Sequence, residues 1–133
     1  MIIPTTNFYD IFRRLKLEFK FPVMELVDRY TIAQVKHSRT GGANQAELDF
    51  YEQQMNGIDK ILIWDELQAF RILHDKIWSL EDDFKKCRID GTDLVEIGKR
   101  ALEIRDYNNF RVQLKNTVAE KLNDPVREVK TNV

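Results

Sequence analysis

The chain has 133 residues, of which 43% are hydrophobic and 32% charged, a composition typical of one globular domain that needs no disulfide or metal to form a core. Its 21 basic and 22 acidic residues give a formal net charge of −1, so no basic excess points to nucleic-acid binding. Five glycines and three prolines favour helices over a turn-rich β fold, and no apolar run approaches the roughly 18 residues of a membrane span.

The N-terminus and the single cysteine indicate where the protein resides. The segment MIIPTTNFYD has neither the basic region nor the continuous apolar region of a signal peptide. Cys87 has no partner for an intramolecular disulfide, and its place at the end of an apolar stripe is typical of a small buried hydrophobe. We therefore expect an intracellular, cytoplasmic protein.

Two helices are predicted before the first glycine-rich loop. Apolar residues at helical spacing predict an amphipathic helix over residues 8–20. Phe21-Pro22 interrupts this pattern, and proline is well placed as the first residue of a second helix over residues 22–38. Because that second helix is apolar over most of its circumference, it should be central in a bundle. Its charged residues then face solvent or line a cleft: Glu25, Asp28, Arg29 and Lys36.

Residues 38–43 (SRTGGA) form the clearest loop, and Asn44 with Glu47 has the spacing of a capping box at the start of another helix. No strand precedes Gly41-Gly42 and no GK[ST] follows, so a phosphate-binding loop is not indicated. The apolar stripe of this helix continues in phase across Asn56-Gly57. We therefore expect a continuous or kinked helix there in preference to a true turn.

The longest helical pattern covers residues 58–87, about 45 Å of helix. Its apolar stripe comprises Ile63, Leu67, Phe70, Leu73, Ile77, Leu80, Phe84 and Cys87. Trp64 and Trp78 lie on a neighbouring face, which predicts a wide buried surface. Such a stripe must pack against other helices or against a second copy of itself.

A glycine turn (RIDGT) precedes the last predicted helix, which Thr92 or Asp93 caps. Its stripe runs from Leu94 to Leu122, and a step of three plus three from Ile104 to Phe110 predicts a bend or a polar layer. Asn123-Asp124-Pro125 ends the helix, and residues 126–133 are expected to be a flexible tail.

Three stretches together resemble a small, uncharacterised all-helical bacterial family. Residues 25–32 (ELVDRYTI) with Lys36 are similar to a pattern E-L-L-D-[KR]-x-T-I-L-x-x-K, and residues 77–83 (IWSLEDD) are similar to L-W-x-[IL]-E-D-x. Residues 108–111 (NNFR), followed by Leu114-Lys115, are similar to N-D-x-R-x-x-L-K, with Asn109 in place of the aspartate. The resemblance implies an antiparallel helical bundle and brings no established activity.

Polar side chains on faces expected to be inside are the main candidates for a site. They are Glu25, Asp28, Lys36, Trp78, Glu81, Asp82, Asn108 and Arg111. Because buried charges are costly unless paired, one interpretation is a salt-bridge layer that fixes the register of the bundle. The other is a polar cleft for an anionic or amide-bearing ligand, with Arg111 and Lys36 binding the anion.

An enzymatic alternative depends on acidic pairs at i, i+3 spacing. All-α nucleoside triphosphate pyrophosphohydrolases hold Mg²⁺ with such pairs, and Glu25 with Asp28 and Asp49 with Glu52 have this spacing. The second pair departs from E-x-x-E. His37 and His74 lack the spacing of a zinc site, and we interpret them as interior or boundary residues.

The sequence thus predicts an all-α protein, an antiparallel helical bundle of about four to five helices with one long central helix, forming a single domain over residues 1–133. Eight phenylalanines and two tryptophans suggest surplus apolar surface, and hence a homodimer or a protein partner. The predicted function is an interaction or assembly domain without catalysis and without a cofactor. The alternative is a Mg²⁺-dependent pyrophosphohydrolase. Neither nucleic acid nor a membrane is an expected partner.

Overall fold

A computed structural model describes residues 21–89 and 93–129, and this part of the chain is helical without any strand. The predicted helix over residues 8–20 lies outside it. None of the helices described is both long and apolar enough to cross a membrane. The all-α prediction is confirmed. The elements are α2 (Val23–Arg39), α3 (Gln45–Gln54), a 3₁₀ turn η1 (Met55–Gly57), α4 (Trp64–Ile89) and α5 (Leu94–Lys121).

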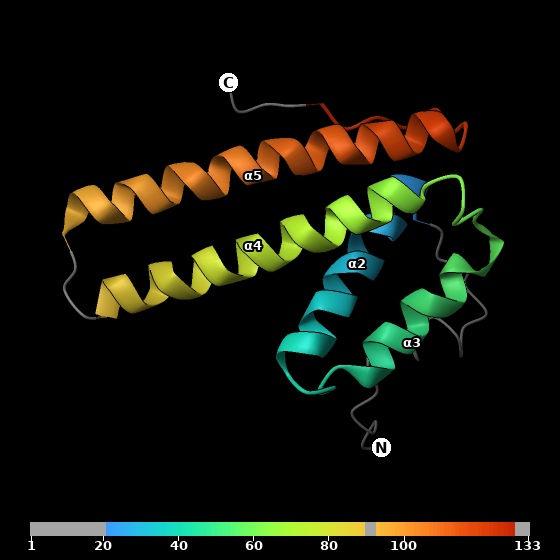
Figure 1. Ribbon diagram of the computed structural model, residues 1–133. Coiled ribbons are helices and arrows are strands. Elements are labelled where there is room, and N and C mark those ends of the chain that lie inside the picture. The colour runs from blue at the N-terminus through green and yellow to red at the C-terminus, as the bar shows by residue number, and fades with distance from the viewer. Residues whose placement is uncertain (1–20, 90–92, 130–133) are drawn as a thin grey trace, which may run out of the picture.

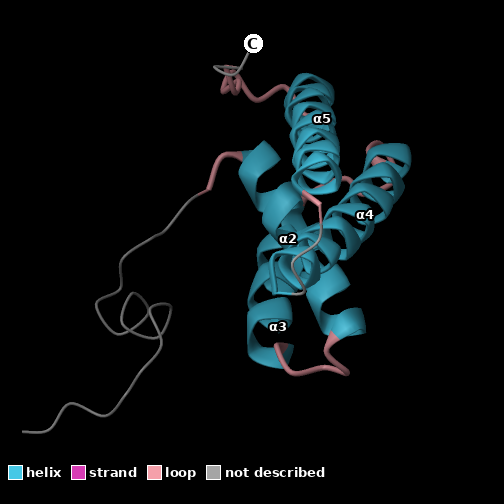
Figure 2. Cartoon of the chain, turned by 90° about the vertical axis from the view of Figure 1, so that its left-hand side faces the viewer, coloured by secondary structure: helices cyan, strands magenta, loops and turns pink. Residues whose placement is uncertain are grey.

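α2 is the centre of the bundle, as its apolar circumference predicts. It contacts α3, α4 and α5, while α4 and α5 pack antiparallel against each other (Figure 1). Figure 2 shows α2 between α3 and the α4–α5 pair. The predicted long helix is confirmed, and the described residues contain two of them, since α4 and α5 have 26 and 28 residues. The long helices form a pair, and the shorter α2 packs against one end of it.

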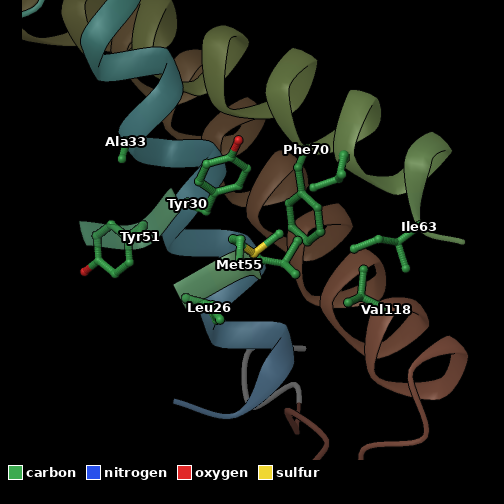
Figure 3. Packing of buried hydrophobic residues seen from close by; sticks show 10 residues of the cluster. Leu26, Tyr30, Ala33, Tyr51, Met55, Ile63, Phe70 and Val118 are labelled. Carbon is green, nitrogen blue, oxygen red and sulfur yellow. The ribbon is translucent and has the colours of Figure 1, made fainter. Parts of the chain in front are cut away.

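The core joins all four helices (Figure 3). The first half of the apolar stripe on α4 is buried as predicted, whereas its second half, from Ile77 to Phe84, is only partly buried. Trp64 is 57% exposed, so the wide buried surface expected around both tryptophans is wrong at this position. The core cluster comprises Leu26, Val27, Tyr30, Ala33, Tyr51, Met55, Ile63, Leu67, Phe70 and Val118.

A true turn separates α3 from α4, so the expectation of a continuous or kinked helix is wrong. The 3₁₀ turn ends at Gly57, Ile58 is extended, and α4 begins only at Trp64. The Asp59 carboxylate stabilises the turn by accepting hydrogen bonds from the backbone N–H groups of Ile61 (3.1 Å) and Leu62 (3.2 Å). The turn allows both Met55 and Ile63 to reach the same core cluster.

Asn44 precedes α3 without forming the predicted capping box. Its amide donates instead to the Ala33 carbonyl at 3.0 Å, and Glu47 pairs with Lys36. Both side chains therefore tie α3 to α2. The loop before Asn44 is tight, since Gly41 and Gly42 have φ values of 64° and 91°, which favour glycine.

The bounds of α5 follow the sequence prediction more closely than its apolar stripe does. Asp93 caps the helix by accepting from the Val95 N–H at 3.0 Å. Leu94 and Phe110, both assigned to the apolar stripe, are 82% and 56% exposed. Beyond Phe110 the charged side chains of Arg111 and Lys115 pair with α2, which agrees with the polar layer that was one of the two expectations for this region.

Glu128 lies within the predicted flexible tail, yet its backbone is hydrogen-bonded to α5. Its backbone N–H donates to the Asn116 side chain at 2.9 Å, and its carbonyl accepts from the same side chain at 3.0 Å. Residues 130–133 of that tail lie outside the described residues.

Candidate functional site

Asp28 on α2 is the most buried charge described, at 1% exposure. Arg111 on α5 holds it with two parallel hydrogen bonds, from Nε to Oδ1 at 2.8 Å and from Nη2 to Oδ2 at 2.5 Å. His74 on α4 places Nε2 3.1 Å from the same Oδ1. One carboxylate therefore connects three helices, with the bidentate geometry that makes an arginine–carboxylate pair strong.

The charges around Asp28 stabilise its ionised form. Burial alone would raise the pKa of this carboxyl, but the hydrogen bonds and charges of His74 and Arg111 outweigh burial and lower the pKa to about 2. In turn, the hydrogen bonds to Asp28 raise the pKa of Arg111 above its ordinary value. The pair is thus charged at any ordinary pH.

Lys115 is a second buried charge, one helical turn further along α5. It is 4% exposed, and its ammonium group pairs with Glu25 of α2 and with Glu128, whose Oε2 lies 2.5 Å away. Burial lowers the pKa of Lys115, but the two carboxylates more than compensate and raise it overall. Of the predicted salt-bridge layer, one pair between its own members is present, Asp28 with Arg111, while Glu25 pairs with Lys115 instead. Both pairs connect α2 with α5.

Two clefts adjoin this layer, and Ile32 and Arg111 line both of them. The first has a volume of about 410 Å³ and contains four of the predicted site residues; its lining is Glu25, Asp28, Arg29, Ile32, Lys36, Glu47, Tyr51 and Arg111. The second, which we call the Trp78 cleft, has a volume of about 210 Å³ and contains four as well; its lining is Ile32, Val35, His74, Ile77, Trp78, Glu81, Asn108 and Arg111.

Asp82 lines neither cleft. Its carboxylate pairs with Lys86 at 3.0 Å on the exposed surface of α4, where i, i+4 pairs are common. The sequence pattern grouped it with Glu81, but consecutive helical residues point in directions about 100° apart.

The four carboxylates of the enzymatic alternative are divided between two sites. Glu25 and Asp28 line the first cleft, where Lys115 and Arg111 engage them. Asp49 and Glu52 line a separate hollow of about 440 Å³ beside Lys60. Within the residues described, no cluster of three or more histidine, cysteine or acidic side chains could hold a metal ion.

His74, Lys115 and Glu128 are members of the network that the sequence did not assign to the site. For Lys115 a signal was present, because Asn108, Arg111 and Lys115 recur at three- and four-residue spacing on one face of α5. His74 is 6% exposed and stacks on Phe70 with ring centroids 5.7 Å apart, which agrees with its interpretation as an interior histidine. For Glu128 no local pattern existed.

Searches against protein-family models, curated proteins and solved structures gave no match to this chain. The resemblance of the three stretches therefore stays an expectation, and function is inferred from the residues.

Proposed function

We propose that this protein is an assembly domain that forms a homodimer through the outer half of its long helical pair. This outer half, residues 80–89 of α4 and 93–104 of α5, is named the α4–α5 arm. Figure 1 shows it extending beyond α2 and α3. α2 ends where Arg39 contacts Asp75 and Ser79 of α4, before the arm begins.

The observation that carries the proposal is the exposure of the arm. None of its side chains whose burial is described is buried, although it contains apolar residues at helical spacing on both helices. Val95 and Leu102 of α5 are 61% and 52% exposed. A helix gains most of its stability from packing an apolar face, and the contact between α4 and α5 leaves Val95 and Leu102 uncovered.

A second copy of the chain is a suitable partner for this surface. Val95 and Leu102 are seven residues apart, so they share a face of α5, and Gly98 between them leaves open space within 4 Å of where a Cβ would be. The arm has six acidic and five basic residues, so two arms would not repel each other. Pairing two such arms about a two-fold axis would create a four-helix arrangement.

The pyrophosphohydrolase alternative has weaker support. Glu25 and Asp28 already neutralise Lys115 and Arg111, and a cation bound to them would have to displace those partners. No distinct observation favours catalysis.

Sedimentation equilibrium of the full chain tests the proposal. We expect the mass of a dimer for the native protein and the mass of a monomer for Leu102→Lys, because the lysine would place a charge in the proposed dimer interface. Ile61→Lys is the matched control, since Ile61 is 89% exposed and lies outside the arm. A native monomer at micromolar concentration, or a dimer that Leu102→Lys leaves intact, would refute this interface.

A further inference from the structure

The Trp78 cleft lies between α2, α4 and α5 and does not overlap the α4–α5 arm except at Glu81. Apolar side chains form part of its wall, and polar groups from two helices converge on it: Trp78 and Glu81 from α4, and Asn108 and Arg111 from α5. Apolar walls with few polar groups are the lining of small-molecule sites, although this cleft is smaller than the roughly 300–1,000 Å³ of drug-sized pockets and suits only a small ligand. Its volume of about 210 Å³ exceeds the roughly 150 Å³ that accommodates benzene in an engineered cavity.

The charges of this cleft are unequally satisfied. The positive charge of Arg111 is matched by buried Asp28 through two hydrogen bonds. By contrast, the described part of the chain provides no ion pair or hydrogen bond for the side chains of Trp78, Glu81 or Asn108. Glu81 is exposed to solvent, and it is the one charged group of the lining without a charged protein partner among the described residues, so its carboxylate is available to a ligand.

We infer that the Trp78 cleft binds an organic cation with N–H groups, a primary ammonium or a guanidinium. Trp78 and Glu81 are three residues apart on α4 and share a face, so an aromatic surface and a carboxylate meet at one place. A cation on an indole ring gains cation–π attraction, and the carboxylate pairs with its charge. The carbonyl oxygen of the Asn108 amide accepts one of its N–H groups.

Two sources provide this chemistry, a free small amine and a lysine or arginine side chain of another protein. Butylammonium and butylguanidinium represent the first source. The N-acetylated, amidated forms of lysine and arginine represent the second. Butanol serves as a neutral probe of similar length, and butyrate as an anion that would seek Arg111. All are compared at constant ionic strength, because salt screens partly exposed charges.

Tryptophan fluorescence reports the binding directly. Trp64→Phe leaves Trp78 as the single tryptophan, and Trp64 is outside the cleft. We expect a saturable change of Trp78 emission with the cations and none with butanol or butyrate. Glu81→Gln should raise the dissociation constant about tenfold, the loss expected for one charge-assisted contact. Asp82→Asn is the matched control and should leave it within about twofold, because Asp82 points away and pairs with Lys86.

Several results would overturn the inference. They are the absence of saturation by any cation while far-UV circular dichroism shows a folded protein, equal binding of butanol, preferential binding of butyrate, and affinity unaffected by Glu81→Gln. The two sources are separated by comparing the free cations with the amino acid derivatives. Tighter binding of the derivatives assigns the cleft to a protein side chain, and weaker binding assigns it to a free amine.

Discussion

Replacing Asp28 with asparagine isolates the contribution of the buried charge, because the side chain keeps its shape and loses its charge. Lowering the pKa of Asp28 from 3.8 to about 2 corresponds to about 2 kcal/mol of native-state stability at neutral pH. Removing one partner of a buried pair costs about 3–5 kcal/mol when the other charge is left buried. The Arg111 side chain is 33% exposed and can regain water, so we expect a loss of about 2–3 kcal/mol.

The pH dependence of that loss follows from the direction of the shift. A carboxyl whose pKa is lower in the folded state stabilises the protein above its unfolded pKa, and that contribution disappears as pH falls through the folded value. The difference in unfolding free energy between the native protein and Asp28→Asn should therefore be constant from pH 7 to 5. It should fall by more than half by about pH 2.5, between the two pKa values.

Urea unfolding followed by circular dichroism, at one protein concentration and several pH values, measures this difference. Asp75→Asn is the control, because Asp75 pairs with Arg39 at 2.8 Å and its side chain is 56% exposed, so we expect it to cost at most about 1 kcal/mol. A loss in Asp28→Asn no larger than in the control would refute the importance of the buried pair. A difference that persists unchanged to pH 2.5 would show that the charge is not its source.

Three further substitutions test separate parts of the fold by thermal melting. Lys115→Met should change the free energy of unfolding by less than about 1 kcal/mol, because the carboxylate partners of Lys115 are near the surface and can be hydrated. A loss above about 3 kcal/mol would contradict this prediction. Gly42→Ala should lower the free energy of unfolding by about 1–2 kcal/mol, since Gly42 has a φ of +91° and a Cβ there would lie 3.3 Å from the His37 side chain. Gly57→Ala is the control and should be neutral, because a Cβ at Gly57 would meet no atom within 4 Å. Asp59→Ala should cost about 1 kcal/mol through loss of two backbone hydrogen bonds, and an unchanged melting temperature would show that the turn does not need them.

The helices were predictable because their apolar residues recur at a local period. α2 was predicted to be central because few of its faces are polar, and Asp93 was one of two predicted caps of α5, with Thr92 as the other. The turn between α3 and α4 was missed because the stripe continues in phase across it. Phase alone does not distinguish one long helix from two that return to the same core. Only the burial of Met55 and Ile63 in one cluster settles that choice.

The polar layer was predictable in composition but not in partners. Glu25 with Asp28 and Asn108 with Arg111 have the spacing of one helix face, so the sequence indicated which side chains could meet. The partners of each charged residue depend on the register between α2 and α5. This register is set by tertiary packing and not by local sequence. Hence Lys115 and Glu128, which complete the network, and Asp82, which is not part of it, needed the structure.

The pairing pattern also explains why the two clefts differ as candidate binding sites. In the first cleft each recorded charge has a partner, such as Lys36 with Glu47 at 3.2 Å, so a charged ligand must break an existing pair. In the Trp78 cleft, Arg111 is bound through two hydrogen bonds to Asp28, which is not part of the lining of this cleft and which matches the charge of Arg111. Glu81 then determines the sign of the ligand. Asp28→Asn would leave the positive charge of Arg111 without its carboxylate partner, so the Trp78 cleft should lose its affinity for cations. The same variant therefore tests both the stability of the bundle and the proposed preference for cations.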